Sequence, residues 1–171
     1  MAMDKYRTFG PRFWAGFIDG LVFLPISLFD TYLSSPARGP IILISWAIVS
    51  YSAYWLYSVS LHARYGQTLG KRAMHVKVMD VSEERIPSLG QAFLRDAGYI
   101  AINASSLVYF IYIVVAHKYV TGAEQVNSLP GMILAFASLG WFLLEVITML
   151  TNSKRRAFHD FIANTVVLNV A

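Results

Sequence analysis

Hydrophobic stretches separated by short polar connections dominate the pattern of this chain. Three of them, residues 39–61, 97–116 and 125–144, contain no acidic residue, lysine, arginine or histidine. Each approaches or exceeds the roughly 20 residues with which an α-helix crosses a hydrocarbon layer about 30 Å thick. A fourth stretch is interrupted by two aspartates, Asp19 and Asp30. The pattern therefore predicts four transmembrane helices, at about 12–33, 40–61, 92–116 and 129–150.

The connection between the second and third helices, residues 62–91, is expected to have structure of its own. Met74, Val76 and Val78 alternate with polar residues, which is the period of two typical of a strand. The β-branched run at 165–170 is also typical of a strand. Because an isolated strand or hairpin is barely stable in water, we expect the two segments to pair as a small β-ribbon.

The tail, residues 151–171, contains the sequence KRRAFHDFIAN before it reaches the last predicted strand. Phenylalanines and an isoleucine share this stretch with several cations, so we expect a short amphipathic helix that lies at the membrane interface. We therefore predict an all-α membrane protein with one domain, residues 1–171. It would be a four-transmembrane-helix bundle with a small β-ribbon and a short interfacial helix.

Composition and charge support this fold and orient it. The chain is 56% hydrophobic and 14% charged, whereas a soluble domain carries about 25% charged residues. All lysines and arginines except Arg38 and Lys118 lie before or at the start of the first helix, in residues 62–95, or after the fourth helix. The positive-inside rule then predicts an inner (cell) membrane protein with both termini and the β-ribbon in the cytoplasm. The same distribution explains the sequence pI of about 9.4 without a nucleic acid partner.

Several kinds of chemistry have no support in the sequence. There is no cysteine, and the four histidines show no metal-ligand spacing. The segment GQTLGKR, residues 66–72, has too few residues between its glycines for a phosphate-binding loop and has Arg72 where that loop needs Ser or Thr. No serine lies in a recognisable hydrolase setting. We therefore expect no enzymatic activity, no cofactor and no bound metal, and a tight turn at 66–72.

The first helix carries charges that its apolar surroundings make costly. Arg12 and Asp19 are seven residues apart, which places them on the same helix face about 10 Å apart along the axis. Gly16 and Gly20 form a GxxxG pattern, so we expect another backbone to approach closely there. Pro25 predicts a kink further along the same helix.

The predicted topology brings charged residues of three helices to similar depths. Asp19, Asp96 and Glu145 fall in the cytoplasmic half of the membrane, near Arg12 and Arg95. Such a cluster can be a buried ion-pair network that orients the helices, or a cation- or proton-binding site open to the cytoplasm. Three acids beside two arginines leave a spare negative charge, and crowded carboxylates raise one another's pKa. Residues expected to assist them are Asn103, His159 and Asp160.

Four blocks of the sequence resemble the RDD family of small membrane proteins. They are PRFWAGFIDG at 11–20, YGQTLGKRAMHVKVMD at 65–80, QAFLRD at 91–96 and KRRAFHDFIANTVV at 154–167. The family is named for one arginine and two aspartates. The resemblance assigns the arginine to Arg12 and the first aspartate to Asp19, and it leaves Asp96 or Asp160 for the second.

The resemblance implies a role in transport, since some family members look like Na⁺(Li⁺,K⁺)/H⁺ antiporters, while others look like accessory or assembly factors. Our first hypothesis is therefore a membrane protein that binds or transports Na⁺, Li⁺, K⁺ or H⁺. Four helices enclose little space, so we expect a homo-oligomer or a complex with a membrane-protein partner. The alternative is a non-transporting scaffold or accessory protein that docks a partner or anionic lipid at its cytoplasmic face.

Overall fold

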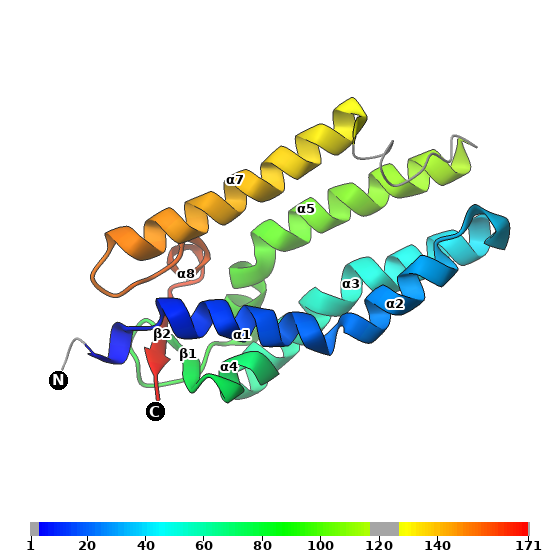
Figure 1. The fold of residues 1–171 in the computed structure, drawn as a ribbon. Coiled ribbons are helices and arrows are strands. Elements are labelled where there is room, and N and C mark those ends of the chain that lie inside the picture. The colour runs from blue at the N-terminus through cyan, green and yellow to red at the C-terminus, as the bar shows by residue number, and fades with distance from the viewer. Residues whose placement is uncertain (1–3, 117–126, 171) are drawn as a thin grey trace.

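The computed structural model describes residues 4–116 and 127–170, and most of them are helical (Figure 1). Lys118 and most of the predicted connection at 117–128 lie outside these residues. The long helices are α1 (Phe9–Val22), α2 (Leu24–Leu33), α3 (Pro40–Tyr65), α5 (Leu89–Val115) and α7 (Leu129–Thr151). The short elements are η1 (Asp4–Tyr6), η2 (Pro36–Arg38), α4 (Leu69–Ala73), β1 (Val76–Asp80), α8 (Phe158–Ile162) and β2 (Thr165–Asn169).

Helices α3, α5 and α7 are each long and apolar enough to cross a membrane. Helices α1 and α2 pass the same test as a pair, with a bend of 45° between them. The break falls at Phe23, two residues before Pro25, because proline cannot donate its backbone N–H to the preceding turn. The kink predicted for the first helix is thus confirmed, and the described residues provide three spans, or four when the bent pair counts as one.

The outward surfaces of these helices are apolar. Phe13 is 62% exposed, Ile41 80%, Val108 67% and Leu129 73%. In the most apolar windows of α3, α5 and α7, only 11–17% of the residues are buried. A water-soluble protein does not expose so much contiguous apolar surface, whereas lipid tails are as apolar as these side chains. The surface is therefore that of a membrane protein.

The short elements gather at one end of the long helices. In Figure 1, α3, α5 and α7 run side by side, and α4, β1, β2, α8 and both termini lie together at the same end. Packing follows the chain order, since α2 contacts α3, α3 contacts α5, and α5 contacts α7. Element η1 also contacts β2, so segments from both ends of the described chain meet at one end of the helices.

Strands β1 and β2 form the predicted ribbon. They pair antiparallel, with a register that runs from Val76 opposite Asn169 to Asp80 opposite Thr165. Val76, Val78 and Val167 are fully buried and form its small core. The tight turn predicted at 66–72 is present only at its start, because Leu69–Ala73 form helix α4. Gly66 ends α3 with a φ of +71°, and a Cβ there would lie 2.6 Å from the carbonyl oxygen of Val78. Glycine alone tolerates both this φ and this approach.

Helix α8 lies where the sequence predicted a short amphipathic helix, and its buried side differs from the pattern in carrying a carboxylate. It is short, and it packs on α5, α7 and β2. Phe161 and Ile162 are 43% and 39% exposed, but Asp160 in its middle is fully buried. The helix therefore presents its most polar residue to the protein interior, because that interior supplies partners for a carboxylate.

Glu83 fastens three separate segments at the surface. Its carboxylate accepts hydrogen bonds from Lys5 Nζ at 2.5 Å, from the Tyr6 hydroxyl at 2.5 Å and from Lys154 Nζ at 3.0 Å. The bond from Lys5 contributes most to the lowering of the Glu83 pKa to about 2, and Tyr6 and Lys154 add to it. The N-terminal segment, the turn after β1 and the tail are thus tied together by one exposed ion-pair network.

Candidate functional site

Asp160 on α8 joins two arginines from different helices. Its Oδ2 accepts a hydrogen bond from Arg12 Nη2 at 2.5 Å, and its Oδ1 accepts one from Arg95 Nη1. The side chains of Arg12, Arg95 and Asp160 are 8%, 4% and 0% exposed. We call these three residues the Asp160 hub. Arg12 lies on α1 and Arg95 on α5, so the hub fixes the relative positions of α1, α5 and α8.

The remaining acceptor positions of Asp160 are also occupied. The backbone N–H of Ala157 donates to Oδ2 at 2.9 Å, and the Thr165 hydroxyl donates to Oδ1 at 3.1 Å. Burial by itself would raise the pKa of Asp160, but the charges of Arg12 and Arg95 outweigh it and hold the pKa well below its usual value. Asp160 is therefore ionised at neutral pH and has donors at both of its oxygens.

Glu145 on α7 lies beside the hub and is less well satisfied. Its Oε2 contacts Nδ1 of His159. Its other oxygen, Oε1, is buried and has no hydrogen-bond partner among the described residues. Burial lowers the pKa of His159, and the charge of Arg95 lowers it further. The hub holds two arginines and one carboxylate, so Asp160 alone does not cancel their charge. When His159 is neutral, Glu145 can balance the remaining positive charge.

Asp19 was predicted to meet Asp96 and Glu145, but the structure assigns it a different set of partners. Its Oδ1 accepts hydrogen bonds from the Tyr57 hydroxyl at 2.7 Å and from the backbone N–H of Gly70 at 2.8 Å, and its Oδ2 accepts one from the Thr68 hydroxyl at 2.6 Å. Asp19 is only 1% exposed. It therefore anchors the first turn of α4 to α1, and its donors are uncharged.

The close backbone approach of α1 occurs at a different glycine from the predicted pair. A Cβ added to Gly16 or Gly20 would meet no atom within 4 Å, so no other described segment of this chain approaches α1 at these two positions, and a contact there with another subunit stays a prediction. A Cβ added to Gly70 would lie 2.0 Å from the carbonyl oxygen of Ala15 and 2.9 Å from Cγ of Asp19. Gly70 allows α4 to reach α1 because the buried face of α1 is formed by Ala15 and Asp19.

Asp96 lies next to Arg95 in the sequence but takes no part in the Asp160 hub. Its Oδ2 is buried and accepts no hydrogen bond within the described part of the chain. Lys71, half-buried on α4, is near enough for Asp19 and Asp96 to act on its charge. Burial lowers the pKa of Lys71 to about 8, with Arg95 adding to the effect and the two aspartates opposing it. Asp96 is thus an acid with an unused buried oxygen, and its charge acts on Lys71 in the same polar layer.

The depressed pKa of Lys71 predicts a pH-dependent stability. Because the pKa falls from 10.5 to about 8 on folding, the unfolded chain binds more protons between these values, and stability should rise as the pH increases through this window. The gain should be about 1–2 kcal/mol, since Lys71 is only partly buried. Thermal unfolding in detergent from pH 7 to pH 10 should show this rise in the wild type and not in Lys71→Met. Lys77→Met should keep the wild-type slope, and an unchanged slope in Lys71→Met would contradict the assignment.

The other predicted residues contribute little to this layer. Asn103 donates from its amide to the carbonyl oxygen of Tyr99, one turn earlier in its own helix, at 2.8 Å. Across residues 4–116 and 127–170, no three histidine, aspartate or glutamate side chains converge as they would around a metal ion. The geometry is therefore a layer of charges and single unpaired oxygens, without a preformed carboxylate cage.

Apolar outward-facing helices that enclose a polar layer at one end define a small multi-pass membrane protein. The model of the RDD family matches residues 6–164, nearly the whole chain, and the chain belongs to the RDD family. No curated protein and no solved structure matches it. Of the two candidates for the second family aspartate, Asp160 is the one that bonds to Arg12.

Proposed function

We propose that this protein binds or transports a monovalent cation or a proton across the inner membrane, as an antiporter-like protein with its polar layer open to the cytoplasm. One observation carries the proposal: buried oxygens of two carboxylates, Asp96 Oδ2 and Glu145 Oε1, have no hydrogen-bond partner among the described residues. A buried carboxylate oxygen without a donor is costly. A bound proton or cation removes that cost.

The balance of charges in the layer supports the same proposal. Its cations are Arg12, Arg95 and Lys71, and its acids are Asp19, Asp96, Glu145 and Asp160. One negative charge is left over when Lys71 is protonated, and a second appears when Lys71 loses its proton. Because the pKa of Lys71 is about 8, this change falls close to physiological pH. Release of a proton from Lys71 would favour capture of a monovalent cation by Asp96, which is the exchange that an antiporter performs.

The contacts divide the acidic residues by role. Asp19 and Asp160 each accept hydrogen bonds at both oxygens, so we assign them to positioning of α4 and α8. Asp96 and Glu145 retain unused oxygens, so we assign ion or proton binding to them. A single carboxylate suits a proton or a weakly held monovalent cation better than a divalent one, which needs more oxygen ligands. The exposed apolar faces of α5 and α7 leave room for a pathway between subunits of an oligomer.

Flux measurements in proteoliposomes test this proposal. Wild-type protein should exchange protons for Na⁺, Li⁺ or K⁺, with faster exchange above pH 8 than below pH 7. Asp96→Asn and Glu145→Gln should each lower the flux by at least about tenfold, since each removes one binding carboxylate. Glu84→Gln, which changes an exposed acid outside the layer, is the matched control and should leave the flux unchanged. Absence of ion-dependent proton flux in the wild type at every pH would refute the proposal.

The alternative function, a non-transporting scaffold or accessory protein, is favoured by the Asp160 hub. Arg12, the family arginine, is paired there with Asp160, and both side chains are almost inaccessible to solvent. In a scaffold the unpaired oxygens would have no role, so the wild type would show no ion flux and Asp96→Asn would leave the abundance of the protein unchanged. Cross-linking in membranes would then recover one consistent protein partner.

A further inference from the structure

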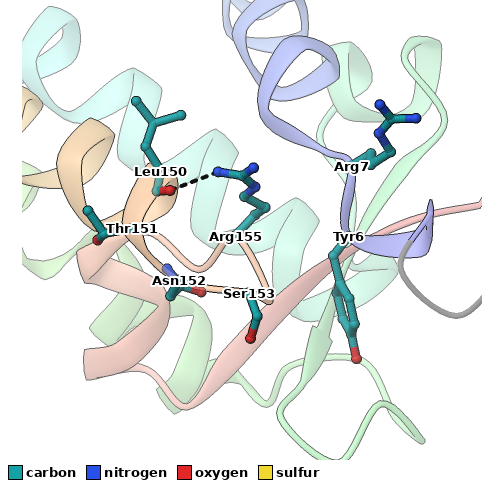
Figure 2. A pocket seen from close by; sticks show the side chains of 7 residues that line it. All are labelled: Tyr6, Arg7, Leu150, Thr151, Asn152, Ser153 and Arg155. Atoms are coloured by element: carbon teal, nitrogen blue, oxygen red, sulfur yellow. Dashed lines mark hydrogen bonds between the residues drawn. The ribbon is translucent and has the colours of Figure 1, made fainter.

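A pocket of about 380 Å³ opens where the start of α1 meets the end of α7. Figure 2 shows the seven residues that line it: Tyr6, Arg7, Leu150, Thr151, Asn152, Ser153 and Arg155. In this view the guanidinium of Arg155 turns toward the Leu150 carbonyl oxygen, and that of Arg7 lies at the other edge of the pocket. The lining contains two arginines and no acidic residue, so it is a site for an anion.

A second hollow of about 290 Å³ continues the first in an apolar direction. It shares Arg7, Leu150 and Arg155 with the first and adds Phe9 and Gly10. Phe9 is 39% exposed and Leu150 49% exposed, and the apolar outer surface of α1 continues from them to Phe13. The two hollows together therefore have a cationic, hydroxyl-bearing part and an adjoining part that faces the lipid-exposed surface.

The turn that carries Arg155 is held in place by several hydrogen bonds. The backbone N–H of Arg155 donates to the Asn152 carbonyl oxygen at 3.1 Å, and its Nη1 donates to the Leu150 carbonyl oxygen at 2.8 Å. Its own carbonyl oxygen accepts a hydrogen bond from Arg12 Nη1 at 3.2 Å, which connects this turn to the Asp160 hub. The guanidinium uses one of its five N–H groups on Leu150 and keeps others for a ligand. The pocket is thus built before any ligand arrives.

We propose that the Arg7–Arg155 pocket binds the phosphate headgroup of an anionic phospholipid. Guanidinium groups match phosphate oxygens in charge and in geometry. The Ser153 hydroxyl provides a further donor for a headgroup such as glycerol. The Thr151 hydroxyl donates to the Ile147 carbonyl oxygen at 2.8 Å and can accept a hydrogen bond from such a headgroup. A lipid fits better than a soluble phosphate because the cationic part continues into the apolar hollow beside Phe9 and Leu150, where the first acyl carbons would lie.

Native mass spectrometry of the full chain in detergent tests this site. Phosphatidylglycerol and phosphatidylcholine are added in equal amounts, and the fraction of protein that retains each lipid is measured. The wild type should retain phosphatidylglycerol preferentially. Arg7→Gln and Arg155→Gln should each weaken that retention about fivefold, while Arg64→Gln, an exposed arginine outside the pocket, should not. Ser153→Glu places a carboxylate at the pocket and should also weaken it, with both arginines intact.

Two results would overturn the proposal. Equal retention of phosphatidylglycerol by the wild type and by Arg7→Gln would show that the lipid binds elsewhere. Displacement of the lipid by glycerol 3-phosphate at equal concentration would identify a soluble phosphate compound as the occupant. Because Arg155 also caps the end of α7, thermal unfolding of every variant is measured alongside, and Arg7→Gln and Ser153→Glu decide the outcome if Arg155→Gln is unstable. None of these measurements depends on ion flux.

Discussion

Asp160→Asn is expected to lower the free energy of unfolding by about 3–5 kcal/mol. The asparagine keeps the shape of the side chain but removes the charge, which leaves Arg12 and Arg95 buried beside each other without a counter-ion in α8. Thermal unfolding in detergent should show this as a large loss of stability. The wild type should also lose stability as the pH falls below the usual aspartate pKa of 3.8, because the hub holds the pKa of Asp160 below that value.

Glu83→Gln is the matched control for this variant. Glu83 also binds two cations, Lys5 and Lys154, but their side chains are 45% and 42% exposed. Exposed ion pairs contribute about 0–1 kcal/mol because water and salt screen them. A loss for Asp160→Asn no larger than that for Glu83→Gln would mean that water reaches the hub, contrary to the burial described here.

Gly70→Ala adds one methyl group and is expected to be the most destabilising such change in the described chain. It should lower the free energy of unfolding by about 3 kcal/mol or more. The new Cβ would lie 2.0 Å from the carbonyl oxygen of Ala15. Since that atom belongs to the backbone of a helix, it cannot rotate away, so α4 must separate from α1. Separation would break the hydrogen bonds from Thr68 and Gly70 to Asp19. The measurement is again thermal unfolding, supported by limited proteolysis after Lys71 and Arg72.

Gly16→Ala makes the same chemical change on α1, away from the contact with α4. A Cβ there meets nothing within 4 Å, and alanine favours a helix by up to about 1 kcal/mol over glycine. The two substitutions should therefore change stability in opposite directions. Destabilisation by Gly16→Ala together with tolerance of Gly70→Ala would mean that α1 packs through its GxxxG face, as its sequence alone suggests.

The spans and the ribbon could be predicted from the sequence because their signals are local. Apolar length predicted α3, α5 and α7, and Pro25 predicted the bend between α1 and α2. A period of two predicted β1, a β-branched run predicted β2, and the instability of an isolated strand predicted that they pair. Each signal depends on residues within one segment. The limits of each helix were less accurate, since α3 continues to Tyr65 and α5 begins at Leu89.

The partners of the charged residues could not be predicted in the same way. Spacing along a helix gives the depth of a residue and its neighbours on one face, but not the direction of that face within the assembled protein. Arg12 and Asp19 share a face by this rule, yet their partners are Asp160 and α4, respectively. The decisive elements, α4 and α8, each span five residues and lie outside the membrane helices. One local signal for α4 was present, since Thr68 precedes LGKR as a helix-capping residue.

The order in which the hub can be completed follows from its connectivity. Arg12 and Arg95 precede Asp160 by 148 and 65 residues. During synthesis both arginines therefore enter the polar layer long before their common carboxylate leaves the ribosome, and β1 likewise precedes its partner β2. A nascent chain that stalls before residue 160 carries two unneutralised guanidinium groups and an unpaired strand edge. Synthesis of the segment that carries α8 and β2 thus completes the polar layer, and a chain that stops before it leaves both arginines and the edge of β1 without their partners.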